Sequence, residues 1–242
     1  MAVQVQGPFQ AQIASDNQMF SRWIHMGNPA ALLASNPWTA TAVNCTPVVA
    51  HVGGRPAVSL AGAGASTDGE NYCDGTAGFR FVSGKQTRIF CGTYLGDSTN
   101  HAFAFGVAVV TTGLVANLAS GGTPPTDFFC LSKLQTVAAI TLRSRKASGT
   151  EEAIAIALPS TIADAQWLDW QIVVAPSSST SGAGTVTVYC RQNLGAWTQV
   201  AYANFGSQIP NTVSTALCLG FRAGSANTTA FAISHVGLEQ EY

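Results

Sequence analysis

Acidic residues that could work as a catalytic pair are few in this chain of 242 residues. Hydrolysis of a glycosidic bond requires two carboxyl groups that flank the bond and are held on rigid elements. Glu151 and Glu152 are consecutive, so on a strand their side chains would point to opposite faces. Asp164 and Asp169 are separated by Trp167 and lie at the entrance of an expected strand. We find no convincing pair and expect no enzyme; a degenerate glycan hydrolase is kept as an alternative that a polysaccharide activity screen would test.

Metal-binding patterns are equally sparse. Asp68, Glu70 and Asp74 share a Gly-rich segment and could supply oxygen ligands to calcium, but their spacing is irregular. We expect this segment to be a solvated acidic loop. No histidine has a second histidine or a carboxylate at ligand spacing; the four are His25, His51, His101 and His235. We therefore expect no metal and no other cofactor.

Other catalytic motifs also fail. Between Gly78 and Gly84 there are five residues instead of the four of a phosphate-binding loop, and Gln86 replaces the Ser or Thr that would meet magnesium. No Gly-x-Ser-x-Gly motif is present, so an α/β-type serine hydrolase is unsupported. The six cysteines, 45, 73, 91, 130, 190 and 218, contain no Cys-x-x-Cys motif. Because the N-terminus lacks the pattern of a secretory signal, we expect free thiols.

Composition narrows the choice of partners. Only 10% of the residues are charged, against about 25% in an ordinary soluble domain, and the formal net charge is −1. Eleven basic and twelve acidic residues give no basic stripe for nucleic acid, and no apolar segment is long enough for a membrane helix. A surface with so little charge favours association, so we expect neighbouring subunits to cover it. Sugar binding through exposed aromatic residues stays possible at Tyr72, Tyr94, Trp197 or Tyr202.

The elements that must position these residues are strands. Alternation with a period of two, bounded by turn residues, predicts half-buried antiparallel strands from residue 46 onward. The clearest case is the run in which Leu168, Trp170, Ile172 and Val174 alternate with other residues. About thirteen short strands suit a two-sheet sandwich. They are expected at 46–52, 56–61, 78–83, 87–95, 102–110, 127–132, 136–143, 152–158, 168–174, 185–191, 196–202, 215–222 and 229–238.

Residues 1–40 differ from the rest, and we interpret them as an extended N-terminal arm preceding a β-sandwich domain at 41–242. The arm is rich in Gln, Asn and Ser, and its few large apolar residues include Phe9, Phe20, Trp23 and Ile24. These four are expected to dock either on the chain's own sandwich or on a neighbouring subunit.

The order of several segments resembles a known group of proteins. These are Lys85-Gln86-Thr87-Arg88-Ile89-Phe90, the run from Phe103 to Ala108, Asp127-Phe128-Phe129, the run from Trp170 to Val174, and the ending from Phe231 to Glu241. Over about residues 46–242 the chain resembles the concanavalin A-like (laminin G-like) virion proteins of tailed DNA phages. The resemblance implies an all-β, two-sheet antiparallel jelly-roll sandwich.

The resemblance also implies a non-enzymatic role, as a decoration or cement protein on the outer surface of a phage capsid, in virions assembled in the host cytoplasm. The partners would then be the major capsid protein and further copies of this chain, with a symmetric trimer suiting the local symmetry of a shell. Phe9, Phe20, Trp23 and Ile24 would be assembly contacts. The alternative is a carbohydrate-binding module of a tail or fibre protein, because sandwich folds host many functions.

Overall fold

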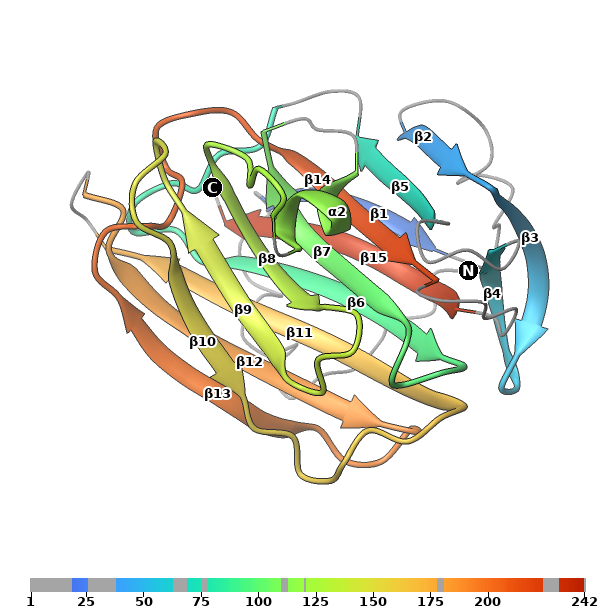
Figure 1. The fold of residues 1–242 in the computed structure, drawn as a ribbon. Coiled ribbons are helices and arrows are strands. Elements are labelled where there is room, and N and C mark those ends of the chain that lie inside the picture. The colour runs from blue at the N-terminus through green and yellow to red at the C-terminus, as the bar shows by residue number, and fades with distance from the viewer. Residues whose placement is uncertain are drawn as a thin grey trace.

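The computed structural model describes residues 19–25, 38–62, 69–74, 78–109, 113–119, 121–177, 181–223 and 231–241. The strands form two stacked layers, which Figure 1 shows with β7, β8 and β9 in front of β6 and β11. The first sheet, called sheet A, contains in spatial order β13 (Thr198–Phe205), β12 (Gly184–Gln192), β11 (Gln166–Pro176), β6 (Thr87–Leu95), β15 (Phe231–Glu241), β4 (Arg55–Gly62) and β3 (Cys45–Val52), and β1 (Met19–His25) also pairs with β15.

The second sheet, sheet B, has seven strands. In spatial order they are β10 (Glu152–Ile156), β9 (Ile140–Arg145), β8 (Phe128–Lys133), β7 (Ala102–Ala108), β14 (Ala216–Arg222), β5 (Gly69–Asp74) and β2 (Trp38–Val43). The strand pairings of both sheets are antiparallel, as β11 with β12 and β7 with β8 illustrate. The prediction of an all-β, two-sheet antiparallel jelly-roll sandwich is confirmed.

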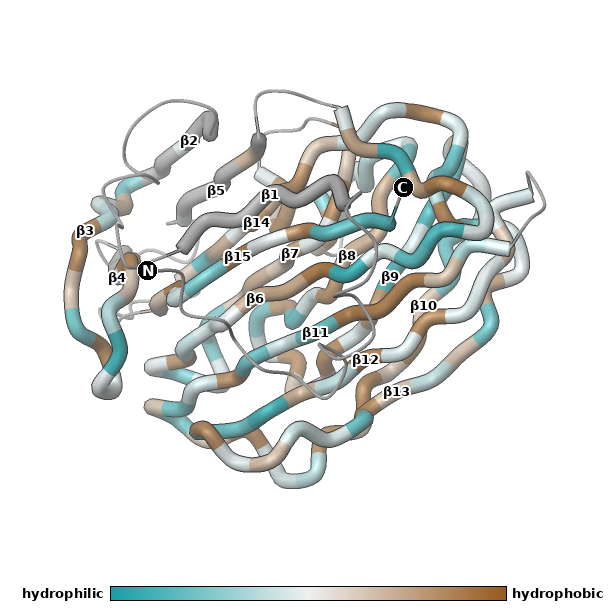
Figure 2. Tube along the Cα trace, turned by 180° about the vertical axis from the view of Figure 1, so that it is seen from behind, coloured by the Kyte–Doolittle hydropathy of each residue, from teal (hydrophilic) through white to brown (hydrophobic). Residues whose placement is uncertain are grey.

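The main core lies between the sheets, where each strand places every second side chain. In β11 the alternation predicted for Leu168, Trp170, Ile172 and Val174 holds, because all four are fully buried in this core. Each such side chain contributes about 1.5–3 kcal/mol by leaving water. From behind, Figure 2 shows hydrophobic and hydrophilic positions alternating along the strands of sheet A. The residues between the core positions of β11 therefore face outward.

A short helix explains why every residue of β7 is buried. Helix α2 (Leu114–Leu118) packs Leu114, Val115 and Leu118 against the outer face of sheet B, where β7 presents Ala102, Ala104 and Ala108. The alanines leave room for the helix, whereas the phenylalanines of β7 point into the main core. The centre of this outer face is thus closed by the chain itself. No helix in the described residues is both long enough and apolar enough to span a membrane.

After residue 61 the structure differs from the expected elements in three stretches. Residues 78–83 form no strand: Phe79 makes one isolated bridge to Thr215, and the chain then leaves the sheet. No strand is expected between residues 61 and 78, but this stretch contains β5, whose polar Glu, Asn and Asp residues give no strand signal and which is stabilised by pairing with β14. The stretch between the strands expected at 102–110 and 127–132 contains helix α2.

Part of the expected arm belongs to the sandwich. Residues 19–25 form β1, which pairs with β15 from Met19 opposite Glu241 to His25 opposite His235. β2 begins at Trp38 and crosses the expected boundary at residue 40. The division into arm and domain otherwise stays a prediction.

Candidate functional site

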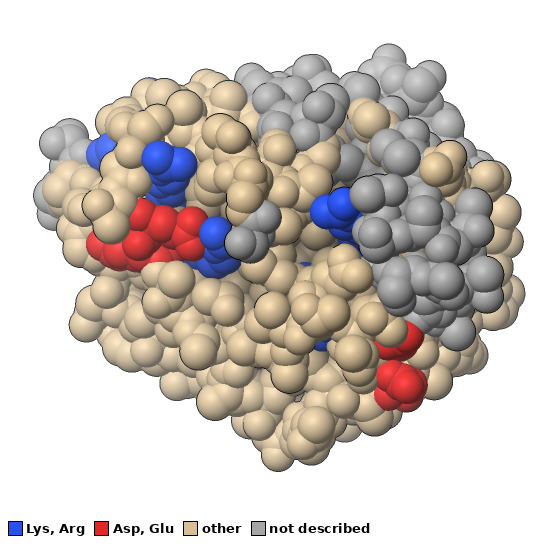
Figure 3. Space-filling view, viewed as in Figure 1, with Lys and Arg blue, Asp and Glu red and all other residues tan. Residues whose placement is uncertain are grey.

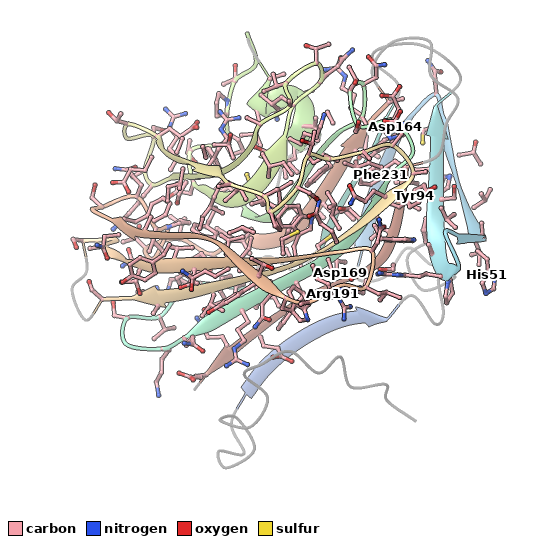
Figure 4. All side chains as sticks on the ribbon, turned by 90° about the horizontal axis from the view of Figure 1, so that it is seen from below. His51, Tyr94, Asp164, Asp169, Arg191 and Phe231 are labelled. Carbon is pink, nitrogen blue, oxygen red and sulfur yellow. The ribbon has the colours of Figure 1, made fainter. Side chains whose placement is uncertain are left out.

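The outer face of sheet A carries a charged and aromatic cluster at the start of β11. Because Leu168 and Trp170 point into the core, Trp167 and Asp169 point to the outside of the sandwich. Asp169 is nevertheless fully buried, because side chains from two other strands close over it. Figure 4 shows Asp169 and Arg191 side by side.

Two arginines hold the two oxygens of Asp169. Arg55 Nη1 donates to Oδ1 at 2.6 Å, and Arg191 donates to Oδ2 through Nε at 3.0 Å, with its Nη2 at 2.9 Å from the same oxygen. The arginine side chains are 15% and 20% exposed. Charge-assisted bonds of this kind are roughly twice as strong as neutral ones. The carboxylate therefore fixes the position of both guanidinium groups.

Each guanidinium also stacks on a tryptophan. The central carbon of Arg55 lies 4.7 Å from the ring centre of Trp167, and that of Arg191 lies 5.0 Å from the ring centre of Trp197. Arg55, Trp167, Asp169, Arg191 and Trp197 together are called the Trp–Arg cluster. Tyr94 extends it, since its ring centre is 5.3 Å from that of Trp167.

A tight hairpin turn brings Arg55 into the cluster. Gly53 and Gly54 connect β3 to β4 with φ angles of 53° and 79°, the two positive values that a type I′ turn needs. The turn packs on Trp167, whose Nε1 donates to the Val52 carbonyl at 3.0 Å. A Cβ atom on Gly53 would lie only 2.6 Å from that nitrogen. The glycine therefore allows the close approach that places Arg55 over the sheet.

A second turn places Trp197. After Arg191 the chain turns through Asn193 and Leu194, both with positive φ, and Gly195 N donates to the Gln192 carbonyl at 2.8 Å. Asn193 ties this turn to β11: its Oδ1 accepts from the backbone N of Trp167 at 2.9 Å, and its own N donates to the Trp167 carbonyl at 3.0 Å. Both flanks of the cluster are thus anchored to the same residue of β11.

Within the described part of the chain, two donors of the cluster have no acceptor. Arg55 Nη2 and Trp197 Nε1 are buried atoms without a hydrogen-bond partner; among the residues that the structure describes, Asn211 Oδ1 is the third side-chain atom of this kind. An unmet buried donor costs about 1–3 kcal/mol. A ligand would recover that cost by displacing the atoms that cover these two donors and bringing acceptors to them, whereas the other bonds of the cluster are already made.

Ser234 and His235 lie beside the cluster at an irregularity of β15. Asp169 is paired across the sheet with Gly92, and Gly92 with His235. Ser234 Oγ is 3.0 Å from His235 Nδ1. This contact joins neighbouring residues of one strand, and both oxygens of Asp169 bind arginines. The described contacts therefore do not form a Ser–His–Asp relay for acyl transfer.

A cavity of about 620 Å³ opens at one end of the sandwich, and it holds a buried lysine. It is lined by Ile140, Ile156 and Leu158 among other residues, with Lys133 in its wall. Lys133 Nζ donates to the carbonyls of His101 at 3.0 Å and of Thr99 and Leu134 at 3.5 Å each. Burial lowers the pKa of Lys133 to about 8, although Asp97 acts in the opposite direction. Because Nζ already has three acceptors, we assign Lys133 to holding the loop and strand ends together.

The acidic residues considered from the sequence are used separately. Glu151 binds Arg143 through both oxygens at 2.6 and 2.9 Å, and Glu152 accepts from the backbone of Gly206 and Ser207. Asp164 accepts from Ser98, and Figure 4 shows it well apart from Asp169. Asp169 itself sits within β11, not at its entrance.

The expected solvated acidic loop is wrong in part, because a strand runs through it. Glu70 and Asp74 belong to strand β5, whereas Asp68 lies outside the described residues. Within the described ranges no group of three or more His, Cys, Asp or Glu side chains could hold a metal ion.

The remaining predicted site residues are scattered. Of the aromatic residues considered for sugar binding, Tyr94 and Trp197 come together at the cluster, whereas Tyr202 on β13 is 59% exposed and Tyr72 lies in β5. Among the assembly contacts, Phe9 lies outside the described residues. Phe20, Trp23 and Ile24 lie in β1, of which the backbone alone is described, so their role stays a prediction.

The two arginines were missed because Arg55 and Asp169 are 114 residues apart, and Arg191 and Asp169 are 22 apart. The contact between Asp169 and Arg191 could have been predicted from an outward-facing Asp opposite an outward-facing Arg, but only if the register of β11 and β12 had been known.

Comparison by sequence found neither a matching family model nor a matching curated protein. Comparison of folds found many similar structures. Peanut lectin has a TM-score of 0.57 at 11% identity, over 92% of this chain and 97% of the lectin. Lectin II from Ulex europaeus has a TM-score of 0.55 at 9% identity, over 94% and 100%.

A phage protein is also similar in structure. The carbohydrate esterase vb_24B_21 of the Shiga toxin-encoding bacteriophage phi24B has a TM-score of 0.51 at 14% identity, over 91% of this chain and 97% of the esterase. Identities this low establish a common fold and leave activity open. The chain therefore has the lectin-like, concanavalin A-like jelly-roll fold.

Proposed function

We propose that this protein binds carbohydrate without cleaving it, and that the Trp–Arg cluster forms part of the binding site. The observation that carries the proposal is the row Trp167–Arg55–Asp169–Arg191–Trp197, which combines two indole rings with two fixed guanidinium groups. Ligand sites typically combine apolar and aromatic surface with a few precisely placed polar groups. A sugar ring has an apolar C–H face that can stack on an indole, and hydroxyl oxygens that can accept from its N–H.

Carbohydrate binding fits the fold and the unmet donors together. The lectins similar to this chain in structure make a sugar a reasonable ligand for the fold, and the two donors without acceptors give it a place on this chain. The carboxylates support binding without cleavage: Asp169 is bound by two arginines, and Glu151 and Glu152 are engaged elsewhere. Glycoside hydrolysis would need a second free carboxyl group beside the first.

A glycan array tests the proposal directly. The wild-type chain is compared with Trp197→Ala, with Trp197→Phe, and with Arg80→Ala as a control at an exposed arginine beside the far end of β15. We expect the wild type and the control to bind the same glycans, and Trp197→Ala to weaken binding at least tenfold. Thermal melting establishes that each variant is folded. Absence of binding to every glycan, or full binding by folded Trp197→Ala, would overturn the proposal.

Capsid decoration is a prediction from the sequence resemblance that none of the structural similarities supports. What favours it is the scarcity of charge, since Figure 3 shows one face that is largely uncharged apart from a few groups of acidic and basic residues. Cosedimentation of the purified chain with undecorated phage capsids would test it. If the chain stays in the supernatant while the capsids pellet, the capsid role is ruled out.

A further inference from the structure

The Trp–Arg cluster carries an excess positive charge. Arg55 and Arg191 bring two positive charges to one carboxylate, so the three groups sum to +1 in a chain whose net charge is −1. Among the described residues, Glu239 and Glu241 on β15 interact with Arg88, which is paired with Val173, four residues further along β11 than Asp169. Both arginines are paired with Asp169, but among the described groups the cluster carries one positive charge more than this carboxylate neutralises, and both arginine side chains are mostly buried. Excess charge in a mostly buried site is unfavourable, so a negative group on a ligand would be stabilised here.

The unmet donors point to the same kind of ligand. Asp169 uses one nitrogen of Arg55, and the other terminal nitrogen, Nη2, has no acceptor among the described residues. Trp197 Nε1 is a second donor without an acceptor, next to Arg191. A guanidinium group matches the planar geometry of a carboxylate, and a carboxylate accepts without donating. A neutral hydroxyl could meet the donors but would leave the excess charge in place.

We infer that the ligand is an acidic saccharide, and that its carboxylate binds at Arg55 while a neighbouring sugar ring contacts Trp197. This inference rests on the proposed function and names the substrate class of the same site. Asp169 is a positioning residue here, because it fixes both arginines and has no free oxygen for the ligand. Arg191 supplies charge from the other side and aligns the ring of Trp197.

The charge of the ligand can be changed while its sugar is kept. Oligosaccharides of galacturonic, glucuronic, mannuronic and sialic acid are each prepared as the free acid and as the methyl ester, and are compared by titration calorimetry with neutral glycans of the same length. We expect at least one acid to bind ten times more tightly than its own ester at low salt. The preference should shrink as NaCl is raised to 1 M, because salt screens partly exposed charges.

Two variants that lose the same charge distinguish binding at the Trp–Arg cluster from an effect of the net charge of the chain. Arg55→Gln keeps an amide donor and removes the charge, so the preference for acid over ester should fall at least fivefold, whereas the control Arg80→Gln should keep it. Should Arg55→Gln fail to fold, the salt dependence of the wild type still decides. Equal binding of every acid and its ester, or binding of neutral glycans alone, would overturn the acidic ligand but leave carbohydrate binding in place. Binding of no glycan at all would overturn both.

Discussion

Replacing Asp169 with alanine should destabilise the fold more than replacing any exposed acid. The substitution removes a fully buried carboxylate that holds Arg55 at 2.6 Å and Arg191 at 2.9 Å. Removing one partner of a buried ion pair costs about 3–5 kcal/mol, because the remaining charge is left without compensation. The arginine side chains keep 15% and 20% of their exposure, so the lower part of that range, about 3 kcal/mol, is expected.

Urea unfolding at pH 7, followed by tryptophan fluorescence, measures this loss. The control is Asp164→Ala, at an exposed aspartate that accepts from Ser98, where a loss of about 1 kcal/mol or less is expected. Converting the three charged residues together, with Arg55→Met, Asp169→Leu and Arg191→Met, should restore most of the stability, because no buried charge then remains. A loss below about 1 kcal/mol for Asp169→Ala would refute the view that this carboxylate organises the cluster.

Three further predictions concern the turn, the lysine and the thiols. Gly54→Ala should cost about 1–2 kcal/mol, because Ala is strained at a φ of 79° although nothing lies within 4 Å of the added Cβ. Gly53→Ala should cost about 2–4 kcal/mol, because the same strain is joined by a Cβ that would lie 2.6 Å from the indole nitrogen of Trp167; thermal melting compares the two variants. The pKa of Lys133 falls from 10.5 to about 8 on folding, so between pH 8 and pH 10.5 the unfolded chain binds more protons than the folded chain. The unfolding free energy of the wild type, measured relative to that of Lys133→Met, should therefore rise by about 1–3 kcal/mol from pH 8 to pH 10.5. A difference that does not change with pH would contradict the burial of this amine. Burial raises the pKa values of the Cys130 and Cys190 thiols to about 12, so these thiols should react with Ellman's reagent at pH 8 only after unfolding in urea, and rapid labelling of the native chain would contradict their burial.

Strand pattern predicted the sandwich because burial on one face leaves a period of two in the sequence. The run from Leu168 to Val174 and the run from Thr87 to Leu95 show it clearly, and both became central strands of sheet A. β5 was missed because its polar residues give no such signal. Its pairing with β14 also joins residues far apart in the sequence: Cys73 is opposite Cys218, 145 positions away. The bridge at Phe79 shows the reverse case, in which an apolar, alternating segment did not become a strand.

The candidate site could be predicted only in part. Tyr94 and Trp197 were considered for sugar binding from residue type alone, and both belong to the site. Asp169 was considered as a partner of Asp164 because the two are close in sequence. The sheet instead joins it to Arg191 on the next strand and to Arg55 on a hairpin far away in the chain. Proximity in a sheet is set by strand order and register, which local patterns do not specify.

The most direct test of carbohydrate binding at the Trp–Arg cluster is the indole N–H spectrum of ¹⁵N-labelled protein, titrated with the tightest-binding acidic oligosaccharide. Trp197 Nε1 has no acceptor among the residues that the structure describes, whereas Trp170 Nε1 is buried in the core and donates to Thr93 Oγ1 at 3.2 Å. We predict a saturable downfield shift of the Trp197 resonance, assigned with Trp197→Phe, and no change at Trp170. Saturable binding that leaves the Trp197 resonance unmoved would contradict the placement of the site.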